Sequence, residues 1–367
     1  MSDSMTPVFI FAVCQVGAEA ALKKEMAREH PQFKFAYSRP GFVTFKLVPA
    51  DSFEDLQPSF ELKSVFARQY GLSIGQSDAK KAIETARKFA KTGNKIRLHV
   101  FERDQFVPGD EPLGFTAGFL SKKGLEDLQR EAGNEFSILF YDQPVAEDGD
   151  LVLDYIAIGE NEFWLGYHQH TPLKSPFPGG RPTLTPDPTA PSRAYYKLDE
   201  AIQWSGVSFS KEDTAVEIGS APGGSCYLLL KNGLKTVIGI DPGQMSPLLS
   251  NFSNFFHIQK PVNSVLREEL PESIQWLLLD LNVHPNVSLF AVDRLASRMK
   301  DSLLGVFLTV KLNKWSLADE IPYMLKHVRA MGMVRVRATQ LASNRQEIMV
   351  FGLTRKGLAR SPRSLIG

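Results

Sequence analysis

Cysteine is scarce in this 367-residue sequence, which contains only Cys14 and Cys226. Two cysteines are too few for a small fold held together by disulfides or for a cysteine-based zinc site. A reducing compartment is the simplest setting for such a chain, so we expect a cytoplasmic protein without a disulfide.

Long apolar runs are also missing. The run Val8–Val13 is short, has no basic leader and passes directly into a charged stretch at 18–29. This pattern predicts a strand followed by a helix and not a signal peptide. No segment approaches the ~20 consecutive apolar residues that span a bilayer, so we expect no membrane insertion.

Net charge is nearly absent, because 42 lysines and arginines stand against 41 aspartates and glutamates. Nucleic-acid binding depends on where cations cluster and not on their total, so this balance neither supports nor excludes RNA. Apolar residues make up 43% and charged residues 23%, as in ordinary globular proteins. The length predicts two or three domains.

A proline-rich stretch divides the sequence. Seven prolines between Gly166 and Pro191 exclude a continuous helix or a central strand there, so we place the main domain boundary in this stretch and expect a linker at 168–191. A spacer is the favoured interpretation. The alternative is a segment that wraps the catalytic domain and touches substrate through Lys174, Gly179, Gly180 and Arg181.

The two halves differ in pattern. The first half mixes a helical stretch, Asp78–Ala90, with β-rich runs, which predicts an α+β region: Val8–Val13, Phe42–Leu47, Lys95–Phe101, Phe136–Tyr141 and Leu151–Ile158. In the second half, β-rich runs alternate with segments of helical length, which predicts a mostly parallel sheet covered on both faces: Thr214–Gly219, Val237–Asp241, Ile274–Leu281 and Leu303–Leu312. The last two runs, Met333–Leu341 and Glu347–Thr354, are so close that they must form an antiparallel hairpin.

A glycine-rich turn follows the first strand of the second half. The residues Gly219, Ser220, Ala221, Pro222, Gly223 and Gly224 end a β-rich run and open a helix. Glycine permits the tight turn and the close backbone approach that a ligand needs at this position. The alternative is a purely structural turn between strand and helix.

Asp241 ends the next strand, where a carboxylate can accept hydrogen bonds from both hydroxyls of an adenosine ribose. This spacing also fits a dinucleotide, but Ala221 replaces the glycine that lets the backbone approach a pyrophosphate. S-adenosylmethionine has a ribose and no phosphate, so it fits these residues best.

This turn resembles that of the FtsJ-like (RrmJ/fibrillarin-type) branch of the Rossmann-fold methyltransferases. The sequence departs from the branch at Glu217, where Asp is usual, and at Ser225, where Trp is common. The resemblance implies a class I methyltransferase domain at 192–360, with a seven-stranded, mostly parallel sheet that ends in an antiparallel hairpin. It also implies that S-adenosylmethionine contacts Glu217, the glycine-rich turn, Asp241 and Asp280.

The same branch surrounds its target hydroxyl with two lysines and two acids. Matching stretches of this sequence offer Lys197, Asp280, Lys311 and Glu347. The start of an antiparallel strand lies at the same sheet edge as the ends of its parallel neighbours, so we expect Asp280, Lys311 and Glu347 to converge. Each of them, taken singly, has a plainer interpretation as a solvated strand terminus.

A ribose hydroxyl is a poor nucleophile, so its methylation needs a base or a polarising partner. Lys311 is the candidate base, provided that burial and the cation of Lys197 lower its pKa from about 10.4. Asp280 and Glu347 would position both ammonium groups and oppose that lowering. In the alternative, Lys311 only orients the hydroxyl, and the proton leaves later to water.

The amino-terminal half resembles the bacterial RlmM type, chiefly in Val65–Tyr70 and the proline-rich connector. This resemblance implies 2'-O-methylation of a cytidine in 23S ribosomal RNA or its precursor. It also implies a ferredoxin-like subdomain at 1–60 and a THUMP-like RNA-binding region at 61–167.

Cations near the end of the sequence suit RNA phosphates, although a solvated, frayed terminus with a basic tail at 361–367 is an equal interpretation: Arg335, Arg337, Arg345, Arg355, Lys356, Arg360 and Arg363. No cysteine or carboxylate residue stands close to His168 and His170 in the sequence, so we predict no metal site. We expect a monomer. Two rival functions stay open, namely a nucleotide-linked oxidoreductase and a non-catalytic RNA-binding protein with a relic methyltransferase domain.

Overall fold

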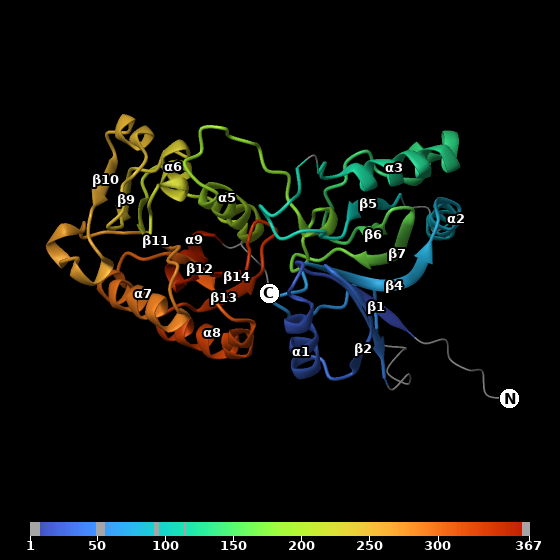
Figure 1. Ribbon diagram of the computed structural model, residues 1–367, viewed down its shortest axis with the longest axis horizontal. Helices are drawn as coiled ribbons and strands as arrows, with labels where there is room; N and C mark the ends of the chain where they lie inside the picture. The colour runs from blue at the N-terminus through green and yellow to red at the C-terminus, as the bar shows by residue number, and fades with distance from the viewer. Residues whose placement is uncertain (1–7, 49–55, 92–94, 114, 362–367) are drawn as a thin grey trace. The chain divides into compact units, whose positions relative to one another are not determined.

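The computed structural model describes residues 8–48, 56–91, 95–113 and 115–361. The chain divides into two compact units, with the division between Pro182 and Thr183. Each unit contains its own seven-stranded sheet (Figure 1). The division falls inside the stretch that the proline content singled out.

The amino-terminal unit is built on a mixed sheet with the strand order β2-β3-β1-β4-β7-β6-β5. Its strands are β1 (Phe9–Val13), β2 (Phe33–Arg39), β3 (Phe42–Leu47), β4 (Gln69–Ser77), β5 (Arg97–Glu102), β6 (Leu151–Gly159) and β7 (Glu162–Gln169). Its helices are α1 (Glu19–Glu29), α2 (Ala79–Ala90), α3 (Phe119–Ala132) and α4 (Phe136–Leu139). Strands before and after residue 60 belong to this one sheet. The expected subdivision into a ferredoxin-like part at 1–60 and a THUMP-like part at 61–167 stays a prediction.

One expected strand is wrong. The run Phe136–Tyr141 was predicted as a strand from its apolar content, but it begins with the short helix α4. Phe140 makes only an isolated bridge to Ile96. Leu139 and Phe140 are buried beside Ala82 and Ala86 of α2, so packing against a helix decides the conformation of this apolar run.

The first part of the proline-rich stretch is attached to the amino-terminal unit. Strand β7 continues to Gln169, and Arg68 donates a hydrogen bond of 3.0 Å to the carbonyl oxygen of Gly179. Asp104 is buried between Arg68 and Arg181. Its Oδ1 lies 2.6 Å from Arg68 Nη2 and 2.7 Å from Arg181 Nη2. Residues 179–181 are therefore bound to this unit, and a free spacer is the wrong description for them.

The carboxy-terminal unit has the strand order β10-β9-β8-β11-β12-β14-β13. Its strands are β8 (Thr214–Ile218), β9 (Thr236–Ile240), β10 (Phe255–Ile258), β11 (Trp276–Leu279), β12 (Gly305–Lys311), β13 (Arg335–Thr339) and β14 (Glu347–Leu353). All neighbours are parallel except those of β14, which is antiparallel to both β12 and β13. The predicted Rossmann-like sheet and its terminal hairpin are confirmed.

Helices cover both faces of this sheet. Figure 1 shows α5 (Ala194–Ser205) and α6 (Gly224–Lys231) on one face, and α7 (Pro285–Met299) and α8 (Ile321–Ala330) on the other. The short α9 (Arg355–Arg360) ends the described chain. Buried apolar side chains from α5, α6 and the sheet form one cluster, which includes Leu198, Cys226, Trp276 and Phe307. This packing fixes the ends of β8, β11 and β12 at one edge, where the predicted site residues lie.

Cys14 and Cys226 are both free and buried. Burial raises the pKa of each thiol well above its ordinary value. Among the described residues, no helix is long and apolar enough to cross a bilayer.

Candidate functional site

Four charged side chains meet at the carboxyl edge of the second sheet. Lys197 comes from α5, Asp280 follows β11, Lys311 ends β12 and Glu347 begins β14. Lys197 Nζ lies 3.1 Å from Asp280 Oδ2 and 2.8 Å from Glu347 Oε1. Lys311 Nζ lies 2.8 Å from Asp280 Oδ1 and also donates a hydrogen bond to Glu347 Oε2. The structure thus brings all four predicted residues into a ring of alternating charge.

The backbone explains why the ring forms. Lys311 and Glu347 are directly opposite partners in the antiparallel pair β12–β14, and directly opposite residues point to the same face of a sheet. Asp280 follows β11, the parallel neighbour of β12. Register therefore delivers three of the four side chains to one place before any side-chain interaction acts.

Burial and charge oppose each other at Lys311. Burial by itself lowers the pKa of Lys311, but the carboxylates of Asp280 and Glu347 outweigh burial and raise that pKa above its ordinary value. At Glu347, burial raises the pKa of the carboxyl, and the ammonium groups of Lys197 and Lys311 more than reverse this effect. The acids prevail, so Lys311 holds its proton at neutral pH in the unliganded protein.

The glycine-rich turn packs tightly against this ring. Gly219 has a φ of 78°, and a Cβ atom there would lie 2.6 Å from the carbonyl oxygen of Asp280. At Gly224, the first residue of α6, a Cβ atom would lie 2.8 Å from the backbone nitrogen of Tyr195 in α5. The two glycines thus let the turn approach β11 and α5 closely, which is a structural requirement that the motif alone did not reveal.

Asp241 is fixed by the same turn. Its Oδ2 accepts a hydrogen bond of 3.2 Å from the backbone nitrogen of Ala221, and its Oδ1 accepts one of 2.7 Å from that of Gly243. An ionised carboxylate has about four acceptor positions, so each oxygen of Asp241 retains capacity for a further donor. The carboxylate is therefore pre-oriented to receive two hydroxyl groups.

Glu217 occupies an unexpected environment. The residue is only 2% exposed, and Cys226 Sγ donates a hydrogen bond of 3.0 Å to its Oε2. Burial raises the pKa of Glu217 to about 7, although hydrogen bonds from Cys226 and Ser225 oppose this rise. Neither partner was predicted from the sequence, although Ser225 and Cys226 lie in the first turn of α6, directly after the glycine pair.

Histidines form a separate buried cluster in the amino-terminal unit. His168 lies in β7, not in a linker, and its Nδ1 is 2.7 Å from Asp154 Oδ2. His99 Nδ1 is 3.6 Å from the other oxygen of Asp154. The prediction that His168 lacks carboxylate company is therefore wrong, because Asp154 is distant from it in sequence but adjacent in the sheet. Among the described residues, no three His, Cys, Asp or Glu side chains are placed to hold a metal ion.

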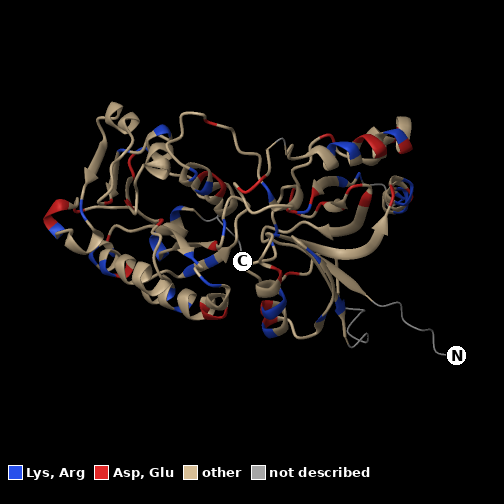
Figure 2. Ribbon diagram, viewed as in Figure 1, with Lys and Arg blue, Asp and Glu red and all other residues tan. Residues whose placement is uncertain are grey.

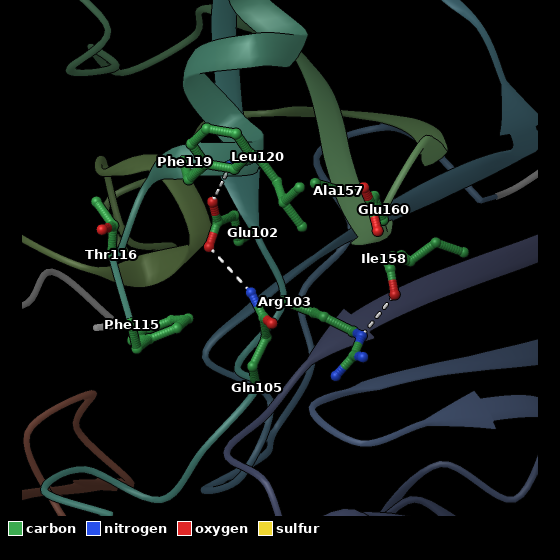
Figure 3. Close-up of a pocket in the computed structure, with 11 residues that line it drawn as sticks. Glu102, Arg103, Gln105, Phe115, Thr116, Phe119, Leu120, Ala157, Ile158 and Glu160 are labelled. Atoms are coloured by element: carbon green, nitrogen blue, oxygen red, sulfur yellow. Dashed lines mark hydrogen bonds between the residues drawn. The ribbon is translucent and has the colours of Figure 1, made fainter. Parts of the chain in front are cut away.

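The amino-terminal unit also has a pocket of about 510 Å³ (Figure 3). Glu102 accepts hydrogen bonds there from the backbone of Leu120 and from Gln105, while Arg103 bonds the carbonyl oxygen of Ile158. Leu120 lies in the first turn of α3, so Glu102 satisfies a backbone donor at the start of this helix. None of the predicted site residues lines this pocket.

Some of the basic residues near the carboxyl end form hydrogen bonds within the protein. Arg360 donates hydrogen bonds to both oxygens of Asp213, and Lys356 bonds the carbonyl oxygen of Asp301. Figure 2 shows basic and acidic residues interspersed on helices of each unit. Arg363 and the rest of the predicted basic tail after Ser361 lie outside the described residues.

Comparison with known proteins bears on the second unit. The family model for FtsJ-like methyltransferases matches residues 190–349. The ribosomal RNA large subunit methyltransferase M of Halorhodospira halophila is 29% identical over 180 residues, which cover 48% of this chain and 50% of that protein. The chain spans about half the length of the first of these curated relatives.

A longer match extends to the amino-terminal unit. The protein of the same name from Azoarcus sp. is 25% identical over 369 residues, covering 93% of this chain and 95% of that protein. A solved structure from Plasmodium falciparum, described as a ribosomal RNA methyltransferase, is 23% identical, covers 45% of this chain and 97% of that chain, and has a TM-score of 0.34.

Proposed function

We propose that this chain, whose residues 190–349 form an FtsJ-like methyltransferase domain, transfers a methyl group from S-adenosylmethionine to a ribose 2'-hydroxyl of RNA. The ring of Lys197, Asp280, Lys311 and Glu347 carries the proposal. Two ammonium groups and two carboxylates around one point can hold an alcohol oxygen in a fixed orientation, and such alignment is a large part of the catalysis of a displacement reaction.

The substrate in this proposal is a cytidine of 23S ribosomal RNA or its precursor. Support for ribosomal RNA comes from relatives that are named as large-subunit ribosomal RNA methyltransferases. The cytidine rests on the resemblance to the RlmM type. RNA binding by the predicted THUMP-like region, residues 61–167, belongs to the same proposal.

The cofactor site in this proposal consists of the glycine-rich turn with Glu217, Asp241 and Asp280. The two oxygens of Asp241 keep acceptor capacity for the ribose hydroxyls of S-adenosylmethionine. Glu217, when ionised, offers a negative charge for the amino group of the methionine part. S-adenosylmethionine supplies a methyl group activated by a positively charged sulfur.

The raised pKa of Lys311 favours the orienting mechanism over the general-base mechanism. In this mechanism, the Lys311 ammonium donates a hydrogen bond to the 2'-oxygen, and Asp280 or Glu347 accepts the hydroxyl hydrogen. One lone pair of the oxygen then points at the methyl carbon. The new C–O bond would form as the bond between the methyl carbon and the sulfur breaks, which would leave S-adenosylhomocysteine, and the hydroxyl proton would pass to water afterwards. Lys197 holds both carboxylates in place.

The proposal is tested by incubating the purified protein with S-adenosylmethionine, carrying a radiolabelled methyl group, and 23S ribosomal RNA from cells that lack this protein. We expect label on one cytidine, mapped as a 2'-O-methyl group by its resistance to alkaline cleavage. Calorimetry with S-adenosylmethionine and with NAD distinguishes the proposal from an oxidoreductase. Binding of NAD alone, or RNA binding without label transfer, would contradict the proposal.

A further inference from the structure

The loop that leads into Glu347 is anchored by a buried acid that the mechanism above does not use. Residues 340–346 join β13 to β14, and Glu200 of α5 reaches this loop. Its Oε1 accepts a hydrogen bond of 2.7 Å from the backbone nitrogen of Ala342, and its Oε2 accepts one of 2.8 Å from that of Ser343. Glu200 is 2% exposed, so these bonds are shielded from water and correspondingly strong.

The anchored loop in turn holds the carboxylate of Glu347. Asn344 is fully buried; its side-chain oxygen accepts the backbone N–H of Leu341 at 2.9 Å, and its Nδ2 lies 3.5 Å from Glu347 Oε1. The backbone nitrogen of Arg345 lies 3.4 Å from the same Glu347 oxygen. Asn344 and Arg345 lie between Glu347 and the residues bound by Glu200. Both of them therefore contact the Glu347 carboxylate directly.

The same helix also contacts Glu347 from the other side. Lys197 lies three residues before Glu200 in α5, so both side chains occupy neighbouring positions on one side of the helix. Lys197 Nζ is 2.8 Å from Glu347 Oε1. Helix α5 therefore holds Glu347 twice, through its carboxylate by Lys197 and through the preceding loop by Glu200.

We propose that Glu200 is a positioning residue for methyl transfer, which sets the place of the Glu347 carboxylate relative to Lys197 and Lys311. The inference rests on the proposed function. Glu200 accepts hydrogen bonds from the loop backbone, and Asn344 and Arg345 of the same loop contact the Glu347 carboxylate, so the loop transmits the position of Glu200 to Glu347. A carboxylate suits this role because both of its oxygens accept hydrogen bonds, whereas a glutamine amide offers only one acceptor oxygen.

The test compares wild type with Glu200→Gln and Glu200→Ala, assayed with 23S ribosomal RNA below the melting temperature of the least stable variant. A shift of about 1 Å in a catalytic group can cost about 100-fold in rate. We expect kcat to fall about 10-fold in Glu200→Gln and about 100-fold in Glu200→Ala, while the Kd for S-adenosylmethionine changes less than about 2-fold. The loss should be smaller in Glu200→Gln, because glutamine keeps one acceptor oxygen for the loop, whereas alanine keeps none.

Two further readouts separate positioning from a general loss of stability. Glu347 helps to raise the pKa of Lys311, so displacement of Glu347 should move the pH dependence of kcat toward lower pH in Glu200→Ala. Amide hydrogen exchange at Ala342 and Ser343 should also accelerate in both variants, because each amide loses its acceptor or shares a poorer one.

Asp213 provides a matched control in the same unit. This residue is 2% exposed and precedes β8 at the opposite edge of the sheet. It accepts hydrogen bonds from the backbone of Ser210 at 2.9 Å and from Trp276 Nε1 at 2.8 Å. Asp213→Asn should lower the melting temperature and leave kcat and its pH dependence as in wild type.

The outcomes are distinct. Glu200 variants that lose stability but keep the kcat and pH dependence of wild type would overturn the positioning role. A loss of activity that follows weaker S-adenosylmethionine binding would overturn it as well. If wild type itself transfers no methyl group to RNA, the proposed function fails and the inference fails with it.

Discussion

Lys311 and Glu347 face each other across the antiparallel pair β12–β14 as backbone partners and also form an ion pair. Their meeting is therefore set by strand register. A shift of one residue in the pairing of β14 would turn the side chain at position 347 to the other face of the sheet. The ring at this edge consequently depends on the same hydrogen-bond ladder that stabilises the core.

Substitution of Lys311 by Ala should reduce methyl transfer to RNA by at least about 100-fold, because the 2'-oxygen loses its aligning donor. The Kd for S-adenosylmethionine should stay close to that of wild type. Single-turnover label transfer and calorimetry measure the two quantities. Lys235→Ala is a suitable control, since Lys235 is exposed and precedes β9 at the far edge. Wild-type turnover in Lys311→Ala would refute the assignment.

Substitution of Asp241 by Asn should weaken S-adenosylmethionine binding by about 10-fold or more. Hydrogen bonds to a charged acceptor contribute about 1.5–3 kcal/mol each, and the amide also loses an acceptor for the backbone nitrogen of Ala221 or Gly243. Calorimetry measures the Kd. An unchanged Kd would show that the ribose is bound elsewhere.

The buried carboxyl of Glu217 should make stability depend on pH. Its pKa rises from the ordinary 4.5 to about 7 in the folded protein. Its contribution to the free energy of unfolding is therefore fully present below pH 4.5 and is lost as pH rises through about 7. The loss amounts to about 3 kcal/mol in the free energy of unfolding. Urea unfolding of wild type and Glu217→Gln between pH 4.5 and 8 measures it. Parallel pH dependences in the two proteins would contradict this prediction.

Ionisation of the same group should affect the cofactor in the opposite direction. In the proposed cofactor site, the Glu217 carboxylate is ionised above pH 7 and then carries the charge that would hold the methionine amino group, so affinity for S-adenosylmethionine should rise as pH increases from 6 to 8. Calorimetry over this range should show the rise in wild type and a flatter profile in Glu217→Gln. Equal profiles would place the amino group away from Glu217.

Substitution of Gly219 by Ala should destabilise the protein more than substitution of Gly233 by Ala. Both glycines have a similar positive φ, 78° and 76°, so each alanine incurs the cost of that conformation, about 1–2 kcal/mol. At Gly219 the new Cβ would also lie 2.6 Å from the carbonyl oxygen of Asp280, whereas at Gly233 the nearest atom is 3.9 Å away. Calorimetric melting compares the two. Equal melting temperatures would show that the turn near Asp280 can relax.

The sequence predicted the second unit better than the first for a physical reason. In the second unit, buried runs such as Trp276–Leu279 alternate with helices, so each strand is a continuous apolar segment. In the first unit, β4 contains Gly71 and Gly75 and mixes polar with apolar residues, and it was not predicted. Its strand conformation comes from pairing with β1 and β7, which local patterns do not contain.

The site was predictable to the extent that topology determines it. The ends of β11 and β12 and the start of β14 had to meet, and Asp280, Lys311 and Glu347 do lie together. The hydrogen bonds that Glu200 accepts from Ala342 and Ser343 join residues more than 140 positions apart, so no local spacing in the sequence predicts them. The direction of the Lys311 pKa likewise required the distances to both acids.

Each of the two units contains one buried cysteine, so the reactivity of the two thiols can be used to measure local unfolding of each unit separately. Cys14 lies in the amino-terminal unit and Cys226 in the carboxy-terminal unit, and both thiols are buried with a raised pKa. Alkylating reagents attack the thiolate, so each thiol becomes reactive only when its surroundings open. The alkylation rate of each cysteine, followed by mass spectrometry, therefore reports the opening of its own unit, and no engineered label is needed.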